Sequence, residues 1–269
     1  GIPVRVVFLT NGDGSLSTQI VEDAHRPAQL LSRRQSFLRM AKTRQAEARA
    51  ALQKLGVPAS EIIFLGYPDG GTRAMWEQNW LPSTPYRSKY TASSASPYDN
   101  SFTPGAVYCG RQALQDVARV IENWRPTVVL TTHPGDTHGD HYAAYAYTRA
   151  ALEMLRLRHP AEYSAARVRL QTFLIHQGLW PVPHGYHPDS PLAPPAALQK
   201  TGTQWTYAPL APAERAAKKA ALECYVSQLA FTPYYLRSFV RRNELFGTVP
   251  ALVEGDEDER WDETQAGDA

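Results

Sequence analysis

The sequence predicts an α/β fold in which helices cover a mostly parallel sheet. Short apolar runs rich in β-branched residues alternate along the chain with longer segments of helical spacing. This alternation is typical of strand–helix–strand units with right-handed crossovers. The chain has 269 residues, of which 43% are hydrophobic, and it can therefore bury one large core. We expect a single domain over residues 1–252.

The first half of the chain predicts two strands joined by a helix. Residues 4–9 form the first apolar run, which ends at the turn Asn11-Gly12-Asp13-Gly14. Apolar residues spaced for one helix face follow over residues 32–55, and Gly56-Val57-Pro58 closes that helix. Residues 61–65 are the second strand, and the turn after it carries Asp69.

The regular pattern lapses between residues 72 and 105, where Trp, Tyr, Ser, Pro and Asn dominate. A long irregular insertion inside a compact domain is typical of a functional lid or of disorder. Its aromatic side chains favour order. They would suit a sugar-binding surface, or they would simply pin the loop to the body, and the sequence supports both readings equally.

The second half predicts a helix over 112–123, a buried strand over 126–132 and an Ala-rich helix after His141. A further strand spans 168–175 and ends at His176. A Pro-rich stretch over 181–195 and a helix over about 212–230 complete the pattern.

Charge is distributed unevenly along the chain. Residues 253–269 hold eight acids and one Arg, a net charge of −7, and we predict a disordered, solubilising tail. The formal charge of +2 for the whole chain then leaves +9 for the body. Such a body could attract an anionic substrate or a nucleic acid, but we favour a solvated basic surface and expect no nucleic-acid partner.

Two further features limit the class of protein. Cys109 and Cys224 are too few and too far apart for a disulfide framework, so we expect reduced thiols. No apolar run approaches the length of a membrane span, and a cytoplasmic location is our expectation.

Three predicted strands end in loops with polar side chains. The carboxyl ends of parallel strands lie along one edge of a sheet, so these side chains should converge there. The group comprises Asn11, Asp13, Asp69, Asp136, His138, Asp140 and His141.

The stretch His138-Gly139-Asp140-His141 is the most informative part of this group. Neutral imidazole is a common zinc ligand, and a neighbouring carboxylate orients it. One or both histidines could bind a metal, or one could bind it while the other donates a proton. Alternatively, Asp140 is a helix N-cap and the histidines are ordinary first-turn residues. A zinc site needs about three protein ligands, so further donors are required.

Three other histidines are candidate donors. His133, before Pro134, is better explained by loop shape than by metal binding. His25 and His176 remain candidates, and His176 stands at the end of a predicted strand, where it could face the site.

Several fragments in order resemble the LmbE-like, or PIG-L, family of zinc-dependent de-N-acetylases. His138-Gly139-Asp140-His141 resembles the family's His-Pro-Asp-His motif, and the resemblance runs from Gly1 to about Phe246. The other fragments are Val6-Val7-Phe8-Leu9-Thr10-Asn11-Gly12-Asp13, Arg44-Gln45-Ala46-Glu47, Phe64-Leu65-Gly66-Tyr67-Pro68-Asp69-Gly70, Arg125-Pro126-Thr127-Val128-Val129-Leu130-Thr131, and Lys219 with Tyr225-Val226-Ser227-Gln228.

The resemblance implies a Rossmann-like three-layer domain and a zinc-dependent hydrolase that removes an N-acetyl group from a GlcNAc-type sugar or glycoconjugate. By the same resemblance, His141 is a zinc ligand, His138 is a catalytic histidine, and Asp140 is the carboxylate that holds His138. Arg44 and Asp69 would line the substrate pocket. Asn11, Asp13 and His176 are further candidates for substrate binding.

The chain departs from the family pattern in two places. Gly139 replaces the usual Pro, which changes loop stiffness more than chemistry. The family's opening Ala-His-Pro-Asp-Asp-Glu motif, which supplies two zinc ligands and the general base, is absent, and Ala24-His25-Arg26-Pro27 echoes it only faintly.

We therefore expect that the first strand and helix of the fold are missing. The chain would be part of a longer polypeptide, or would work with a separate N-terminal fragment. As written, it should bind zinc poorly and hydrolyse little.

Two alternative functions remain open. A metal-dependent phosphoesterase also uses Asp and His clusters at strand ends. A non-catalytic carbohydrate-binding relative would use the aromatic insertion instead. The oligomeric state is not predicted.

Overall fold

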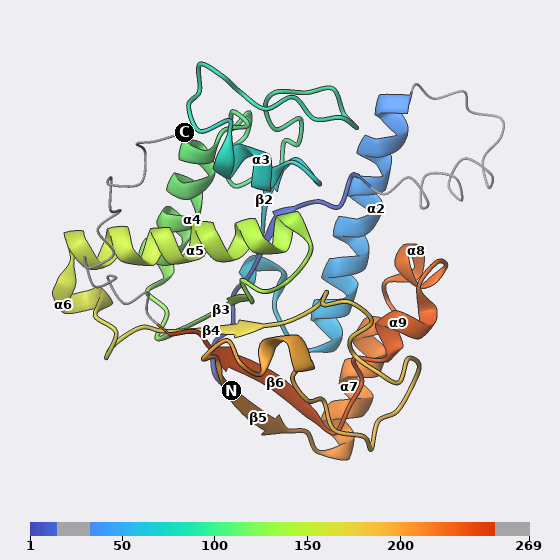
Figure 1. The fold of residues 1–269 in the computed structure, drawn as a ribbon. Helices are drawn as coiled ribbons and strands as arrows, with labels where there is room; N and C mark the ends of the chain where they lie inside the picture. Colours follow the sequence, from blue (N-terminus) through green and yellow to red (C-terminus); the bar gives the residue numbers. More distant parts are fainter. Residues whose placement is uncertain (15–32, 251–269) are drawn as a thin grey trace, which may run out of the picture.

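The computed structural model describes residues 1–14 and 33–250 (Figure 1). His25 with its neighbours, and the acidic segment 253–269, lie outside the described residues. The strands are β1 (Val6–Thr10), β2 (Ile62–Tyr67), β3 (Val128–Thr132), β4 (Arg169–Phe173), β5 (Gln204–Pro209) and β6 (Asn243–Thr248). The α-helices are α2 (Arg33–Lys54), α3 (Thr72–Glu77), α4 (Gly110–Trp124), α5 (Gly139–Arg158), α6 (Pro160–Tyr163), α7 (Pro212–Leu222), α8 (Val226–Leu229) and α9 (Pro233–Arg237).

The strands form two sheets, so the expectation of one mostly parallel sheet is wrong. Strands β1 and β2 pair in parallel, and a second sheet has the order β3-β4-β6-β5. Strands β3 and β4 pair in parallel, while β6 runs antiparallel to both β4 and β5. The fold is therefore mixed α/β.

Strands β5 and β6 are antiparallel because of the way the chain connects them. Pro209 at the end of β5 pairs with Asn243 at the start of β6, and the Leu210 amide donates to the Arg242 carbonyl. The chain through α7, α8 and α9 thus returns to the end of the sheet that it left. A parallel neighbour requires a crossover to the opposite end, so β6 must run backwards along β5.

The strands and helices of the first two-thirds of the chain lie close to their predicted ranges. Helix α2 was expected over 32–55 and spans Arg33–Lys54, and β3 was expected over 126–132 and spans Val128–Thr132. The predicted helix over 212–230 is instead two helices, α7 and α8, with a break at residues 223–225. Strands β5 and β6 were not predicted.

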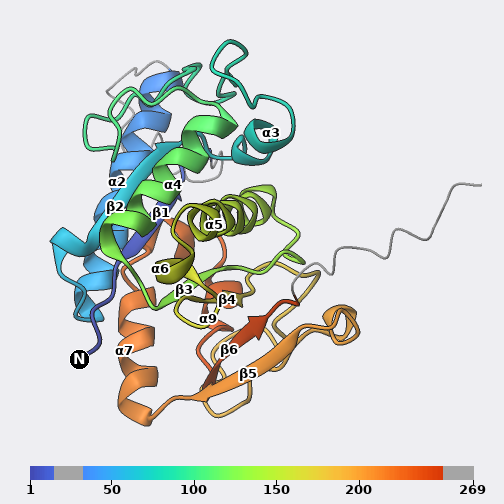
Figure 2. The ribbon, with the colours of Figure 1, turned by 90° about the vertical axis from the view of Figure 1, so that its left-hand side faces the viewer.

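Helices α4 and α5 pack against each other and against both sheets (Figure 2). Their apolar side chains meet Leu65 and Tyr67 of β2 in one cluster, and Val129 and Leu170 of the second sheet in another. Helix α2 covers the opposite face of β2, where Ala48 and Leu52 contact Ile62 and Phe64. The β1–β2 sheet is thus the middle of three layers, with the site at its carboxyl edge.

The insertion over 72–105 is ordered and begins with the short helix α3. Tyr98 and Thr91 in this segment are buried, and the Ser88 amide donates to the Ser93 carbonyl. Aromatic side chains hold the insertion on the body, as Trp76 packs edge-on against Tyr147 of α5. None of the described helices combines the length and apolar character that a membrane crossing requires.

Candidate active site

The carboxyl ends of β1, β2, β3 and β4 bring together two groups of polar side chains. We call Asp13, Asp69 and Asp140 the carboxylate cluster, and His138, His141 and His176 the imidazole cluster. Asp13 and Asp69 lie at the turns after β1 and β2, Asp140 lies in the first turn of α5, and the imidazole cluster lies after β3 and β4. Helix α5 links them, since its first turn contributes Asp140 and His141.

The carboxylate cluster is held by hydrogen bonds from the turns around it. Asp13 is fully buried, and its Oδ2 accepts from the Tyr98 hydroxyl at 2.6 Å while Oδ1 accepts from the Asp69 amide at 3.1 Å. Asp69 Oδ2 accepts from the Gly14 amide at 2.9 Å. The insertion therefore reaches the site through Tyr98.

Asp140 is the third member of the carboxylate cluster, and its carboxylate turns towards the β2–α3 loop. Oδ2 accepts from the Gly70 amide at 2.7 Å, and Oδ1 accepts from the Thr72 amide at 3.2 Å and the Thr72 hydroxyl at 2.5 Å. The contact with His138 comes from the Asp140 backbone, whose amide donates to His138 Nδ1 at 3.3 Å. The expected hold of Asp140 on His138 is thus made by its amide and not by its carboxylate.

Burial and neighbouring carboxylates favour the protonated forms of Asp13 and Asp69. Burial, together with the neighbouring charge of Asp140, raises the pKa of Asp69 to about 7. Burial also raises the pKa of Asp13, against the lowering effect of its hydrogen bond from Tyr98. The nearby Asp140 carboxyl group adds to the effect of burial on Asp69, because a second negative charge at short range is unfavourable.

The imidazole cluster packs three rings against one another. The ring centres of His138 and His141 are 4.7 Å apart, those of His138 and His176 are 5.7 Å apart, and those of His141 and His176 are 5.2 Å apart. The rings of His141 and His176 are nearly parallel, at 16°. His138 is exposed and the other two are half-buried, so the cluster is open to solvent.

Asp136 organises the loop that carries the imidazole cluster. Its Oδ2 accepts from the amides of Ile175 and His176 at 3.0 and 2.8 Å, and Oδ1 accepts from the His138 amide at 2.9 Å. Oδ1 also lies 3.1 Å from His141 Nδ1. Burial alone would raise the pKa of Asp136, but its bonds with His141 and the backbone amides lower it below the usual value.

These contacts assign opposite hydrogen-bonding states to His138 and His141. Nδ1 of His138 accepts a hydrogen bond from the Asp140 amide, so in the neutral ring Nε2 carries the hydrogen. Nδ1 of His141 lies 3.1 Å from the Asp136 carboxylate but makes no hydrogen bond of standard geometry among the described residues. A hydrogen on this Nδ1, with the lone pair on Nε2, is the arrangement that the neighbouring carboxylate favours. His138 is thus a hydrogen-bond donor through Nε2, and Nε2 of His141 is a potential metal ligand or base.

Asn11 and Arg44 lie at the β1 side of the site. Asn11 is 4% exposed, and neither its side-chain nitrogen nor its oxygen has a hydrogen-bond partner within the described part of the chain. Arg44 Nη1 donates to the Gly12 carbonyl at 2.9 Å. Gly12 has a φ of +67°, and a Cβ there would meet the Arg44 side chain at 2.6 Å, so the close approach of Arg44 requires a glycine.

His133 takes no part in the imidazole cluster. Its Nδ1 accepts from the Gly135 amide at 2.9 Å, and its ring stacks on Trp205 with centres 5.2 Å apart. This confirms the loop-shape interpretation of His133-Pro134.

The described residues do not by themselves complete a metal site. Across residues 1–14 and 33–250, no group of three or more His, Cys, Asp or Glu side chains is arranged to hold a metal ion. His141 offers one suitable nitrogen, so additional ligands would have to come from elsewhere.

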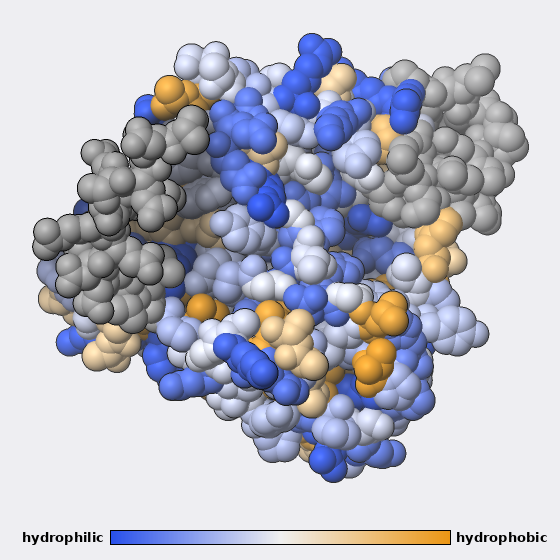
Figure 3. All heavy atoms as spheres, in the orientation of Figure 1, coloured by the Kyte–Doolittle hydropathy of each residue, from blue (hydrophilic) through white to orange (hydrophobic). Residues whose placement is uncertain are grey.

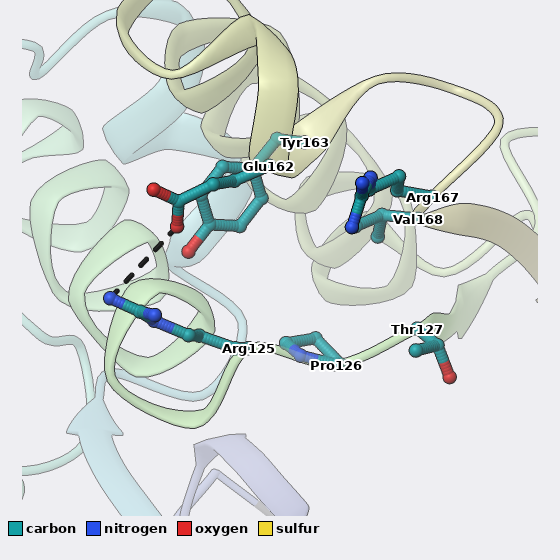
Figure 4. A pocket seen from close by; sticks show the side chains of 7 residues that line it. All are labelled: Arg125, Pro126, Thr127, Glu162, Tyr163, Arg167 and Val168. Carbon is teal, nitrogen blue, oxygen red and sulfur yellow. Dashed lines mark ion pairs between the residues drawn. The ribbon is translucent and has the colours of Figure 1, made fainter.

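A pocket lies at the opposite edge of the sheet (Figure 4). It has a volume of about 470 Å³ and is bordered by Thr127 and Val168, which precede β3 and β4. Arg125 and Glu162 face each other across it at 3.9 Å, and both are largely exposed. No histidine lines this pocket, so it is separate from the site.

The molecular face seen in Figure 3 is largely hydrophilic, with apolar residues in small separate groups. Such scattered apolar residues are normal for a protein surface.

The family described as GlcNAc-PI de-N-acetylase, PIG-L, matches residues 1–152. This chain belongs to the PIG-L family. The match covers both clusters except for His176, and it confirms the resemblance found in the sequence. A search among curated proteins found no match.

Two solved structures illustrate the fold of this PIG-L protein. The A40926 pseudoaglycone deacetylase is 15% identical, with a TM-score of 0.50 over 92% of this chain and 85% of that one. The 4-carboxy-2-hydroxymuconate hydratase of Pseudomonas putida KT2440 is 16% identical, with a TM-score of 0.50 over 94% and 87%. At this identity the likeness shows the fold alone, and the two names differ in chemistry, so function must be argued from the site.

Proposed function

We propose that this PIG-L protein is a zinc-dependent hydrolase that removes the N-acetyl group from a GlcNAc-type sugar or glycoconjugate. One observation carries the proposal. At the carboxyl edge of the strands, the His138 and His141 rings lie 4.7 Å apart, with His138 Nδ1 accepting from the Asp140 amide and His141 Nδ1 3.1 Å from the Asp136 carboxylate. Amide hydrolysis needs both a group that stabilises the oxyanion and an activated water.

His138 is the proposed oxyanion stabiliser. Its Nε2 hydrogen would bond to the amide oxygen as negative charge develops there. Its Nδ1 stays bound to the Asp140 amide, which keeps the ring in one orientation at the start of α5. The exposed position of His138 suits contact with a substrate.

His141 is the proposed zinc ligand, through Nε2. The carboxylate of Asp136 against Nδ1 fixes the ring and raises the basicity of Nε2, as carboxylates do for zinc-bound histidines. When bound, zinc polarises the amide carbonyl and lowers the pKa of its water to around 7. The remaining ligands are outside the described residues, and we assign no reaction step to the metal here.

The substrate side of the proposal rests on the carboxylate cluster and its neighbours. Asn11 has a buried amide with free hydrogen-bonding capacity, and a sugar provides hydroxyl groups to use it. A protonated Asp69 would donate a hydrogen bond, whereas an ionised one only accepts. These groups suit a polyhydroxylated ligand.

We further propose that a separate N-terminal segment completes the sheet between β1 and β3. Each of these strands pairs on one side only among the described residues. Val7 and Leu130 are 39% and 49% exposed on strands that a doubly covered parallel sheet would bury. An added parallel strand would pair both edges at the place where the proposed zinc ligands are needed.

Acetate release tests the proposal. The full-length protein, with any residues upstream of Gly1, is incubated with N-acetylglucosamine conjugates, and acetate is followed by proton NMR. We expect acetate, and a loss of about 10²–10³-fold in His138→Asn, the range for removal of one oxyanion-stabilising donor. His187→Asn, which alters a histidine outside the cluster, is the matched control.

The same assay distinguishes the alternatives. Phosphate released from phosphate esters, without acetate from the amides, would identify a phosphoesterase. Sugar binding without turnover, unaffected by His141→Ala, would identify a carbohydrate-binding protein. Either result would overturn the deacetylase proposal.

A further inference from the structure

His176 is the member of the imidazole cluster that the His-Gly-Asp-His motif does not include. It follows β4, and its ring lies against His141 on one side and Tyr235 of α9 on the other, with ring centres 5.2 and 5.4 Å away. Its backbone amide is held by Asp136. The ring thus lies between His141 of α5 and Tyr235 of α9, and Asp136 of the loop before α5 holds its backbone.

The hydroxyl of Tyr235 makes two short contacts at this point. It lies 2.5 Å from the Ile175 carbonyl oxygen and 2.9 Å from His176 Nδ1. A carbonyl oxygen can only accept, so the single hydroxyl hydrogen must point to Ile175. With the hydrogen committed there, the Tyr235 oxygen is an acceptor towards His176.

Nδ1 of His176 must therefore carry a hydrogen and donate it to Tyr235. In the neutral ring Nε2 then holds the lone pair, and no described residue makes a hydrogen bond to it. The ring is only half-buried, which leaves this nitrogen accessible to a ligand.

We propose that Tyr235 is a positioning residue that locks His176 in the Nδ1–H tautomer, so that Nε2 of His176 accepts a hydrogen bond from a substrate hydroxyl beside the reacting amide. The tautomer lock stands on the geometry alone, while the hydroxyl contact rests on the proposed function. The imidazole cluster then offers a substrate one donor, on His138, and one acceptor, on His176, next to the nitrogen that His141 reserves for the metal.

Nitrogen-15 NMR of histidine-labelled, metal-free protein tests the tautomer lock. Spectra are recorded near pH 8.5, about two units above the ordinary imidazole pKa, and His176→Gln identifies the signals of His176. We expect a protonated Nδ1 and a bare Nε2 in the wild type, and a shift towards protonated Nε2 in Tyr235→Phe. Tyr234→Phe, the exposed neighbour on α9, should match the wild type.

Two results would overturn the lock. One is a hydrogen on Nε2 of His176 in the wild type. The other is a Tyr235→Phe spectrum in which His176 keeps the Nδ1–H form.

Two substitutions of His176 test the hydroxyl contact. The Gln side chain places its amide near the position of Nε2 and can still accept, whereas the shorter Asn reaches only the position of Nδ1. We expect His176→Asn to raise KM for the acetylated sugar about 10-fold with kcat changed less, which corresponds to the loss of one neutral hydrogen bond. His176→Gln should stay within about threefold of the wild type. Equal effects of the two substitutions would contradict the contact.

A sugar titration separates this inference from the proposed function. N-acetylglucosamine added to the labelled protein should shift the Nε2 signal of His176, even in a preparation that releases no acetate. A shift of this signal, combined with no acetate release from the zinc-loaded full-length protein, would refute the deacetylase and support the contact. Acetate release with an unchanged Nε2 signal would support the deacetylase and refute the contact.

Discussion

Asp136 holds more of the site than any other single side chain. Its carboxylate accepts hydrogen bonds from the backbone amides of His138, Ile175 and His176. It also contacts Nδ1 of His141. The sequence predicted that Asp136 lies with the other polar residues at the strand ends. It assigned the role of holding a catalytic histidine to Asp140, because Asp140 belongs to the family motif. Which carboxylate reaches which ring depends on loop conformation, and spacing along the chain does not determine it.

Asp136→Asn should reduce both stability and activity. The amide keeps one oxygen acceptor but places a donor against backbone N–H groups or His141. We expect a loss of about 1–3 kcal/mol in the free energy of unfolding. We also expect kcat/KM to fall about 10–100-fold, the usual effect of losing the partner of a metal-bound histidine. Urea denaturation and acetate kinetics measure the two effects.

The exposed Asp189 offers the control, since it is paired only with Arg215 at the surface. Asp189→Asn should leave both quantities within error. Equal stability of Asp136→Asn and wild type would contradict the role given to Asp136.

Asp69 gives the stability a pH dependence of defined sign. Its pKa in the folded protein is about 7, raised from 3.8, so folding favours the protonated form. The stabilisation that comes from protonated Asp69 is therefore fully present below a pH of 3.8, the pKa of Asp69 in the unfolded chain. It is lost as the pH rises through about 7, the pKa in the folded protein. Between pH 5 and 8 the loss from this group should be roughly 1–3 kcal/mol.

Asp69→Asn should remove most of that pH dependence. The amide cannot ionise, its oxygen can still accept from Gly14, and its nitrogen can donate to Asp140. We expect the Asp69→Asn variant to be close to wild type at pH 5 and more stable than wild type at pH 8, as measured by urea unfolding. A wild-type stability that rises from pH 5 to pH 8 by as much as the variant's would exclude a protonated Asp69.

At the scale of elements, helix α5 positions the donor and the ligand together. His138 is its N-cap, with extended backbone angles of φ −82° and ψ 128°, and Gly139 is the first helical residue. The helix itself was predicted from its spacing, but its start was not, because Asp140 is the more usual capping residue. The histidine cap brings the His138 and His141 rings together.

Gly139→Pro should stabilise the protein and preserve the site. Proline suits the first position of a helix, and the angles of His138 suit a residue before proline. A Cβ at this position meets only the Arg73 side chain, at 3.5 Å. We expect a gain of about 0.4–1 kcal/mol, or a rise of about 1–4 °C in Tm, measured by calorimetry.

A lower Tm, or a fall in acetate release, would mean that the Gly139 amide or its flexibility is required. Gly135→Pro is a poor substitute, because a side chain there would meet Leu198 at 2.7 Å. It should destabilise the protein.

At the scale of the whole molecule, the sequence predicted the parallel units and missed the antiparallel ones. Strands β1 to β4 follow apolar runs, and their positions were close because burial on both faces gives continuous apolar sequence. Strand β5 is mostly exposed, with the burial pattern of an edge strand, and carries Trp205 and Tyr207 among polar residues. No pattern in the local sequence predicts that β5 pairs with β6, because β6 lies more than thirty residues further along the chain.

The unpaired edges of β1 and β3 yield a prediction for the whole fold. Their outward amides should exchange with deuterium fast in the chain of residues 1–269. In a protein that supplies the proposed N-terminal segment, exchange should slow at Val7 and Leu130, while β5, already an outer edge, should be unchanged. Equal exchange at β1 and β3 in the two proteins would contradict the proposed completion of the sheet.

Zinc binding by His141 through Nε2 is the central claim. The direct measurement is the zinc content of the full-length protein and of its His141→Ala variant after dialysis at matched free zinc, with His187→Ala as control. We predict about one zinc per chain in the wild type and the control, and a large loss in His141→Ala. An unchanged zinc content in His141→Ala would contradict the assignment.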